Sequence, residues 1–448
     1  MRLFIISLFL FFHATDAHAQ THKIVKPSKA QLQWHEQEFY LFTHFGPNTY
    51  TDLEWGHGNE AEDIFNPIDL DCNQWADIAK AAGATGIIIT AKHHDGFCLW
   101  PSNFSKHTVR ESKWRDGKGD VLKELSAACK SHGLKFGVYI SPWDRNHPAY
   151  GTAEYNTVFV NMMKELFTNY GPIWELWWDG ANGEGPNGKK QIYDWNLFKK
   201  TVHELSPKTV VFSDIGPQLR WVGNEKGIAS MTNWNTLNIK GFTPGAGAPA
   251  QSVLGTGNVN GSDWIPAECD VSIRPGWFYH RNEDEKVKSP EQLFELYLKS
   301  VGRGANFLLN VPPDPRGKIH SNDSAALVGF QLLKKSNFEN EISISGSFKK
   351  ISRNKFSLVW KNPQEINTIV LAEKIKNGQS ISAFKLNLYQ AENIVKIIEG
   401  TTVGRKRIIT FPLLKIDKIE LELQDLYQRV NLKSLKAFHI TEALVEKT

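Results

Sequence analysis

Short apolar runs alternate with amphipathic stretches through residues 40–311 of the chain. Each run has the length of a buried strand and is bounded by turn residues. We therefore predict six strands, at residues 40–45, 86–91, 135–140, 175–178, 209–213 and 306–311. Strands that alternate with helices are typical of a parallel sheet covered by helices.

Helices between these strands are predicted from their capping residues. Residues 121–132 follow Asp120 and end before Gly133. An aspartate before a helix accepts hydrogen bonds from its first N–H groups, and glycine commonly ends one. By the same signals we predict further helices at residues 73–82, 155–170, 193–205 and 290–301.

Residues 216–287 show no regular alternation. Their Gly, Pro and Asn content predicts long loops over one face of the domain. No glycine-rich dinucleotide turn follows the first strand, which argues against a nucleotide-binding open sheet. We therefore predict that residues 20–340 form a (β/α)8-type barrel.

The pattern changes near residue 340. Short runs rich in Ile, Val, Phe and Leu follow, at residues 348–360, 367–372, 380–389, 394–398 and 407–411. Turn pairs such as Asn377-Gly378 separate them. We predict that residues 341–448 form an antiparallel β-sandwich that packs against the barrel, with carbohydrate binding as the alternative role.

The first 19 residues have the pattern of an export signal peptide. Arg2 precedes an apolar run at residues 3–12. Ala17-His18-Ala19 then provides small residues for cleavage before Gln20. The run is shorter than the roughly 20 residues that cross a bilayer, and no later stretch qualifies. We expect an exported protein, periplasmic or secreted, with no membrane insertion.

Charge and cysteine content exclude several classes of function. The 52 Lys and Arg nearly balance the 48 Asp and Glu, so the net charge of +4 gives no reason to expect nucleic-acid binding. Residues 341–448 are more basic, with 18 Lys and Arg against 11 Asp and Glu. The four cysteines have no CxxC spacing and are expected to be free or buried thiols. The 15 tryptophans are unusual, and their flat faces suit sugar rings.

Polar and aromatic residues follow four predicted strands, where barrel enzymes carry their active sites. These segments are Thr43-His44-Phe45-Gly46, Lys92-His93-His94-Asp95-Gly96-Phe97, Tyr139-Ile140-Ser141-Pro142-Trp143-Asp144 and Trp177-Trp178-Asp179-Gly180. A metal site is one hypothesis, but zinc needs three or four ligands at one point and successive strand residues face opposite sides. Sugar binding is favoured, because neutral imidazoles hydrogen-bond to hydroxyls while Trp and Tyr stack on sugar rings. No metal or other cofactor is expected.

Glycoside hydrolysis needs two carboxyl groups on either side of the scissile bond. Asp179 is the best candidate for the nucleophile, because apolar walls around it would exclude water. Its alternative role is that of a turn carboxylate before Gly180. For the proton donor the residues alone leave four candidates, which we expect in loops: Glu54, Glu184, Glu225 and Glu268.

Together these motifs resemble glycoside hydrolase family 29, the α-L-fucosidases. The resemblance covers most of residues 30–340 and rests chiefly on His93-His94-Asp95-Gly96-Phe97 and Trp177-Trp178-Asp179-Gly180. Further matches are Trp34-His35, Phe42-Thr43-His44-Phe45-Gly46, Glu54-Trp55-Gly56 and Leu308-Leu309-Asn310-Val311-Pro312-Pro313. The resemblance implies a barrel with a C-terminal β-sandwich, and metal-free retaining hydrolysis with Asp179 as nucleophile. It also implies a fucose pocket lined by His44, Trp55, His93, His94, Tyr139 and Trp177.

Residues 220–225 are similar to the proton-donor loop of the branch that cleaves α1,3/4-fucosyl linkages in branched, Lewis-type glycans. This similarity implies that Glu225 is the acid/base, with Glu268 as its rival. We expect burial and the charge of Asp179 to raise the pKa of Glu225. Glu54, Trp221 and Trp277 are further candidates for substrate binding.

The expected partner is thus a fucosylated oligosaccharide or glycoconjugate. Three alternatives remain. The first is a non-catalytic, lectin-like protein that binds fucose. The second is a fucosidase with a broader linkage range. The third is a metal-dependent hydrolase that uses His93 and His94 and would be sensitive to chelators.

Overall fold

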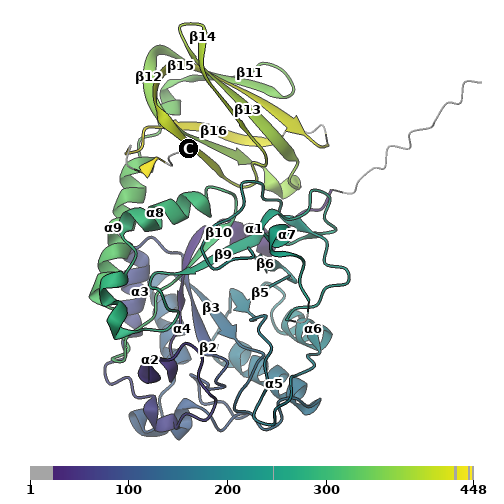
Figure 1. Cartoon of the computed structure of the whole chain (residues 1–448), viewed down its shortest axis with the longest axis vertical. Helices are drawn as coiled ribbons and strands as arrows, with labels where there is room; N and C mark the ends of the chain where they lie inside the picture. Colours follow the sequence, from purple (N-terminus) through teal and green to yellow (C-terminus); the bar gives the residue numbers. More distant parts are fainter. Residues whose placement is uncertain (1–23, 246, 428–430, 442–443, 446–448) are drawn as a thin grey trace, which may run out of the picture.

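The computed structural model describes residues 24–245, 247–427, 431–441 and 444–445. The predicted export signal lies outside the described residues. Two parts follow one another along the chain, a barrel with its helices and a C-terminal antiparallel sheet (Figure 1). No helix in the described ranges combines the length and the apolar character needed to cross a bilayer.

Eight parallel strands close into a barrel in the order β1-β10-β9-β6-β5-β4-β3-β2. They are β1 (Phe39–Thr43), β2 (Gly86–Lys92), β3 (Lys135–Ile140), β4 (Glu175–Trp177), β5 (Val210–Ser213), β6 (Leu219–Trp221), β9 (Ala267–Ser272) and β10 (Asn306–Asn310). The six predicted strands are all present, and the barrel prediction is confirmed.

The prediction of long loops over residues 216–287 is wrong in part, because β6 and β9 both come from this segment. The first is only three residues long, and polar residues interrupt the second. Neither strand therefore appears in the sequence as a continuous apolar run. Five residues, 214–218, join β5 to β6 without a helix, which departs from a regular (β/α)8 alternation. The hairpin β7 (Thr236–Leu237) and β8 (Asp263–Trp264) encloses α7 (Gln251–Thr256).

Helices cover the outside of the barrel. Those close to the predictions are α3 (Cys72–Ala81), α4 (Val121–His132), α5 (Glu154–Asn169), α6 (Trp195–Leu205) and α8 (Pro290–Lys299). Asp120 caps α4 by accepting a hydrogen bond from Lys123 N at 2.9 Å, and Gly133 ends the helix with φ +68°. The prediction did not include α1 (Lys29–His35), α2 (Asn48–Thr51) and α9 (Ser321–Phe338). The buried side of α9 includes the polar residues Asp323 and Asn337, which weakens its apolar helical pattern.

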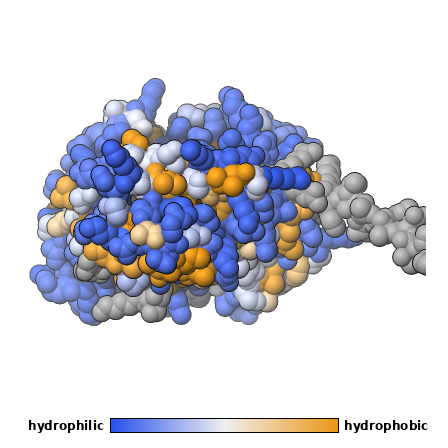
Figure 2. All heavy atoms as spheres, turned by 90° about the horizontal axis from the view of Figure 1, so that it is seen from above, coloured by the Kyte–Doolittle hydropathy of each residue, from blue (hydrophilic) through white to orange (hydrophobic). Residues whose placement is uncertain are grey.

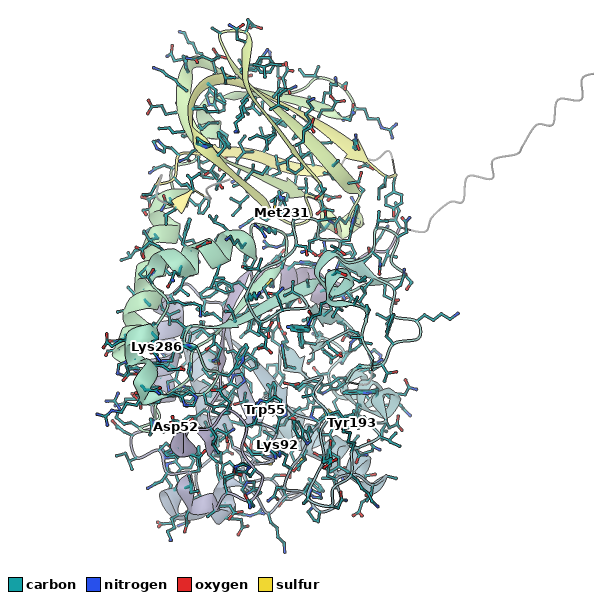
Figure 3. The ribbon with its side chains drawn as sticks, in the orientation of Figure 1. Asp52, Trp55, Lys92, Tyr193, Met231 and Lys286 are labelled. Carbon is teal, nitrogen blue, oxygen red and sulfur yellow. The ribbon has the colours of Figure 1, made fainter. Side chains whose placement is uncertain are left out.

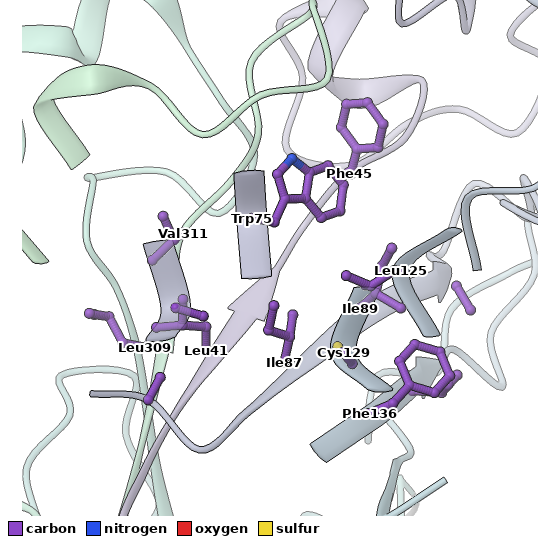
Figure 4. Close-up of a cluster of buried hydrophobic side chains, with 14 of the residues drawn as sticks. Leu41, Phe45, Trp75, Ile87, Ile89, Leu125, Cys129, Phe136, Leu309 and Val311 are labelled. Carbon is purple, nitrogen blue, oxygen red and sulfur yellow. The ribbon is translucent and has the colours of Figure 1, made fainter. Parts of the chain in front are cut away.

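Successive residues of the barrel strands fill two separate apolar layers. Ile87 and Ile89 of β2 point outwards, where they meet Trp75 of α3 and Leu125 of α4 (Figure 4). Ile88, between them, belongs to the inner layer. The inner layer forms the floor of the barrel mouth. The four cysteines are free and buried, as expected.

The C-terminal domain is an antiparallel sheet with the path β11-β12-β15-β13-β14, and β16 pairs with β12. Its strands are β11 (Ser347–Lys350), β12 (Lys355–Glu373), β13 (Ile381–Gln390), β14 (Asn393–Gly400), β15 (Arg407–Asp425) and β16 (Leu432–Phe438). Register shifts near Val359 and Ile366 divide β12 into two halves, and side chains from both halves share one apolar core. The predicted antiparallel β-sandwich is confirmed.

The C-terminal domain packs against the barrel through polar contacts. Glu38, just before β1, pairs with Arg405 and Lys406, which precede β15. Asn235 N donates to Oε1 of Gln379 at 2.8 Å. Seen from the end of the molecule that carries this domain, the surface is mainly hydrophilic with small apolar patches (Figure 2).

Candidate active site

The ends of four neighbouring strands bring together the predicted pocket residues. The rings of His44 and His93 lie 5.7 Å apart between centroids, and those of His93 and His94 lie 4.2 Å apart. His93 also stacks on Tyr139 at 5.8 Å, and Tyr139 stacks on Trp177 at 5.3 Å. The structure therefore gathers histidine and aromatic rings on one rim.

Consecutive strand residues would normally face opposite sides, yet His93 and His94 lie side by side. The reason is the end of β2. The pairing of β2 with β3 shifts register between Thr90 and Lys92, and the strand ends at Lys92. Strand alternation therefore no longer applies at residues 93 and 94.

Burial keeps the three imidazoles neutral. It lowers the pKa of His44 to about 3 and that of His94 to about 4, and it lowers the pKa of His93 well below its usual value. At neutral pH each ring therefore has one N–H donor and one acceptor nitrogen. Such groups recognise sugar hydroxyls without attracting ions.

The tautomers of two histidines follow from their partners. Nδ1 of His44 lies 2.8 Å from Oδ1 of Asn310, an acceptor, so Nδ1 carries the hydrogen. Nδ1 of His94 lies 2.7 Å from Oγ of Ser141, which itself donates to Trp143 O at 2.8 Å. Both rings therefore keep Nε2 as an acceptor for a ligand hydroxyl.

Asp179 is fixed at the edge of this cluster. Its Oδ1 accepts a hydrogen bond from Ala181 N at 2.7 Å, and its Oδ2 accepts one from the Tyr139 hydroxyl at 3.1 Å. Nε2 of His94 lies 3.8 Å from Oδ2. The Asp179 side chain is 25% exposed, which leaves it accessible from the pocket mouth. Burial and the charge of Asp179 raise the pKa of Tyr139 well above its usual value, so the phenol stays a donor.

Trp177 lies among these rings and is supported from inside the barrel. Its ring stacks on Phe212 at 4.0 Å, and its Nε1 donates to Oε1 of Glu268 at 2.9 Å. The other Glu268 oxygen accepts a hydrogen bond from Tyr40. Burial raises the pKa of both Glu268 and its neighbour Glu175. The charge of Glu268 raises the pKa of Glu175 further, whereas the interaction with Glu175 lowers that of Glu268, so Glu175 is the member of the pair that retains a proton.

The expected loop position of Glu268 is therefore wrong. The residue lies inside β9 and is fully buried in the barrel. Both of its carboxyl oxygens already accept hydrogen bonds from the protein. This position suits the support of Trp177 better than proton donation to a leaving group.

Glu54 shapes the pocket wall through the loop that carries Trp277. Its carboxylate accepts hydrogen bonds from Trp277 N at 2.9 Å, Phe278 N at 3.2 Å and His280 Nε2 at 2.6 Å. The Trp277 ring lies 5.1 Å from His44 between centroids. Glu54 thus acts on the site by holding this loop.

Trp55 lies in the barrel domain, with its label next to that of Lys92, the last residue of β2 (Figure 3). Trp55 is 56% exposed, and its ring lies nearly perpendicular to those of His94 and Trp143, at 5.7 Å between centroids from each. An exposed indole that packs against two buried rings is available to contact a ligand.

Glu225 lies in a surface turn beyond β6. Asn224 closes this turn, since its Oδ1 accepts from Lys226 N at 3.0 Å and its Nδ2 donates to Ile228 O at 2.9 Å. Glu225 is exposed, so the expectation that the protein buries it is wrong. The turn satisfies its own polar groups and leaves the Glu225 side chain on the outside.

Two carboxyl groups of the site were not predicted. Asp270 of β9 accepts a hydrogen bond from Trp221 Nε1 at 3.0 Å, and burial together with the charge of Glu225 raises its pKa well above the usual value. Asp214 follows β5 and accepts from Gly245 N at 3.2 Å. A Cβ at Gly180 would lie only 3.0 Å from Asp214, so this residue contacts the turn that follows Asp179.

The signal for Asp214 was present, because it follows a predicted strand as Asp179 does. Asp270 was hidden, since the strand that contains it was expected to be loop. In the described residues, no three His, Cys, Asp or Glu side chains are grouped as ligands for one metal ion.

Comparisons with known proteins agree with this geometry. The family model described as Alpha-L-fucosidase matches residues 18–331. Alpha-L-fucosidase 1 of Arabidopsis thaliana is 41% identical over 418 residues, which cover 86% of this chain and 81% of the plant protein. A putative homologue in rice, Putative alpha-L-fucosidase 1 of Oryza sativa subsp. japonica, is 40% identical over 430 residues, covering 89% and 82%.

Solved structures show the same similarity. A glycoside hydrolase 29 family member from an unknown rumen bacterium has 39% identity and a TM-score of 0.87, covering 94% of this chain and 78% of that one. A Ruminococcus gnavus GH29 fucosidase in complex with fucose has 26% identity and a TM-score of 0.85, covering 94% and 96%.

Proposed function

The chain belongs to the α-L-fucosidase family of glycoside hydrolases, and from this premise we propose that it is an exported, retaining exo-enzyme acting on α1,3/4-linked fucose in branched glycans. α-L-Fucosidase activity follows from membership. The catalytic residues, the linkage and the export are the proposal.

Asp179 is the proposed nucleophile. It attacks the anomeric carbon of fucose, and the bond to the departing oxygen breaks as a covalent fucosyl-enzyme forms. The hydrogen bonds from Tyr139 and Ala181 support this role, because they fix both carboxylate oxygens before substrate arrives. This fixed carboxylate beside a cluster of neutral histidines is the observation that carries the proposal.

Glu225 is the proposed acid/base. It protonates the departing oxygen in the first step and takes a proton from water in the second. Because Glu225 is exposed, we infer that it is covered only when a glycan binds. Its charge contributes to the raised pKa of Asp270, so the two carboxyl groups lie near enough to interact, which supports this assignment.

The pocket residues divide into hydrogen-bonding and apolar roles. His44, His93 and His94 are proposed to bind fucose hydroxyls, since all three are neutral and two keep a free Nε2 acceptor. Trp177 or Trp277 provides the apolar contact for the fucose methyl group. Trp55 and Trp221 are proposed to contact the glycan that carries the fucose.

The linkage preference rests on residues 220–225 and their similarity to the α1,3/4-specific branch. A galactose held by the loops of residues 216–277 would help to orient the scissile bond, so remote binding would raise the rate as well as the affinity. The proposed export rests on the pattern of residues 1–19.

One panel of substrates tests the function and the linkage separately. We would measure kcat/KM for an aryl α-L-fucoside, a Lewis-type trisaccharide, its galactose-free disaccharide and 2′-fucosyllactose. The trisaccharide is expected to be the best natural substrate. Equal rates on the disaccharide or the α1,2-linked substrate would overturn the linkage. Fucose binding without hydrolysis of any of the four would favour the lectin-like alternative.

A further inference from the structure

A cleft of about 1060 Å³ lies between the barrel and the C-terminal domain. Its walls include the segment before β1, helix α9 and strands β12 and β16. Glu38 lines the cleft at the start of β1, whereas His44 follows the end of that strand. The five residues of β1 separate the two, so six steps of extended chain span roughly 20 Å. The cleft is therefore distinct from the fucose pocket.

The charge of the cleft is strongly positive. Eight lysines and arginines line it, against four glutamates. Arg405 and Lys406 share Glu38, and Lys436 pairs with Glu341. The other five have no ion pair with a described residue: Lys334, Lys335, Lys374, Lys376 and Lys433. The excess of basic residues noted in the C-terminal sequence is thus partly concentrated here.

Lys334 lies against aromatic rings and has no ion pair with a described residue. Its ammonium lies 5.3 Å from the ring centroid of Phe330 and 5.6 Å from that of Tyr297. Burial lowers its pKa to about 8, because aromatic rings replace water less well than a carboxylate would. An anion bound next to it would reverse this effect.

Arg405 also carries buried donor groups that have no partner among the described residues. Its Nη1 donates to Glu38, but Nε and Nη2 are buried and have no hydrogen-bond partner in the described parts of the chain. Unpaired donors on a buried cation are costly. Oxygen-rich anionic groups at this wall would reduce that cost.

The cleft also offers apolar faces. Tyr297, Phe338, Ile375 and Phe438 line it between the cations. Aromatic and aliphatic faces bind the flat sides of sugar rings, and lysines bind their sulfate or carboxylate substituents. The volume is that of a site for a short oligomer rather than a single ion.

We propose that this cleft binds a saccharide segment bearing sulfate or carboxylate groups. The choice of a saccharide rests on the proposed function, since the substrate is itself a glycan. Bound there, an anionic chain holds the enzyme on a polymer while the opposite end of the barrel removes fucose. The site is an anchoring site and takes no part in the reaction.

The test uses the full chain and three labelled hexasaccharides: a heparin-derived one, a hyaluronan one and neutral maltohexaose. Binding is measured by fluorescence anisotropy in 150 mM salt, a condition that weakens non-specific charge attraction. We expect the heparin or the hyaluronan oligomer to bind, which also identifies sulfate or carboxylate as the preferred group. Maltohexaose is expected not to bind.

Two triple variants with the same change in charge locate the site. K374Q/K376Q/K433Q removes three exposed cleft lysines, and K349Q/K350Q/K361Q removes three exposed lysines of the same domain outside the cleft. We expect at least a tenfold loss of affinity in the first and less than a twofold loss in the second. K334Q is expected to weaken binding as well.

Equal losses in the two triple variants would overturn the cleft as the binding site. Failure of both anionic hexasaccharides to bind would overturn the proposal itself. An oligonucleotide of equal charge that bound as tightly as the better hexasaccharide would overturn the choice of a saccharide. Hydrolysis of an aryl fucoside, measured in parallel, is expected to stay within twofold in every variant. If the unmodified chain did not hydrolyse the aryl fucoside, that result would count against the proposed function alone.

Discussion

The Tyr139 hydroxyl donates a hydrogen bond of 3.1 Å to Oδ2 of Asp179; Tyr139 lies in β3, and Asp179 follows the end of the neighbouring strand β4. The bond orients the carboxylate before attack. Its loss is expected to affect catalysis more than folding, because a hydrogen bond to a charged group contributes about 1.5–3 kcal/mol, which shifts the melting temperature of a chain this long by only a few degrees.

Tyr139→Phe should lower kcat about 10- to 100-fold with little change in the melting temperature. Steady-state kinetics on an aryl fucoside would measure this. Tyr170→Phe is the matched control, because the Tyr170 hydroxyl bonds to Asp120 at 3.0 Å beside the cap of α4, away from the pocket. Equal losses of activity in the two variants would show that the Tyr139 bond has no catalytic role.

Asp179→Ala should abolish turnover of every fucoside. Added azide should restore activity and yield a product of inverted stereochemistry, because the small anion fills the space of the carboxylate and attacks from the same side. Proton NMR of the product would establish its configuration. If azide restored activity with retained stereochemistry, or if no small anion restored activity, the nucleophile would be another residue.

Glu225→Ala should lose about 100-fold or more on natural glycans, whose leaving groups need a proton, and much less on activated aryl fucosides. Glu184→Ala changes another exposed loop glutamate and should leave both activities intact. Similar losses of Glu225→Ala on both substrate types would contradict the acid/base assignment.

In a structure with a glycan bound, the carboxyl groups of Asp179 and Glu225 should lie roughly 5–6 Å apart, the separation of retaining enzymes. Crystallography of an inactive variant with the Lewis-type trisaccharide would measure it. A separation of 7 Å or more with the glycan in place would favour inversion instead.

Glu268→Gln tests the rival donor and the support of Trp177. Glutamine keeps the size of the side chain and one acceptor oxygen, so kcat on glycans should stay within about tenfold. Glu268→Ala should cost about 3 kcal/mol of stability and most of the activity, since it leaves a cavity under Trp177 and removes the acceptor of its Nε1. If Glu268 were the acid, Glu268→Gln would lose glycan hydrolysis and keep aryl-fucoside hydrolysis.

Glu373→Gln should change how stability depends on pH. Burial raises the pKa of Glu373 to about 7, above its usual value of 4.5. The folded state therefore holds the proton more tightly. The resulting stabilisation is complete below about pH 4.5 and is lost as the pH rises through 7.

Glutamine removes this dependence. The stability of Glu373→Gln relative to the unmodified chain should rise by about 3 kcal/mol between pH 4.5 and pH 8, measured by urea unfolding. Glu365→Gln, at an exposed position of the same strand, should show no such change. If the difference in stability between Glu373→Gln and the unmodified chain did not change with pH, this carboxyl group would ionise normally in the folded protein.

Local patterns were enough to predict the alternation of strands and helices. Asp120 and Gly133 marked the ends of α4 because capping depends on a few neighbouring residues. The position of Asp179 after an apolar strand marked it as a candidate for the same reason. The pocket histidines were also found this way, since barrels place their chemistry at strand ends.

Only the tertiary structure showed what surrounds each of these residues. Glu268 and Asp270 lie in β9, whose residues are half polar, so no local pattern marks it as a strand. It belongs to the barrel because it pairs with β6 and β10, which are distant in sequence, and is buried between them. Glu225 was expected to be buried and is exposed, because its turn satisfies its own hydrogen bonds. Burial, pKa and hydrogen-bond partners depend on contacts across the whole barrel, and a sequence pattern reports only on near neighbours in the chain.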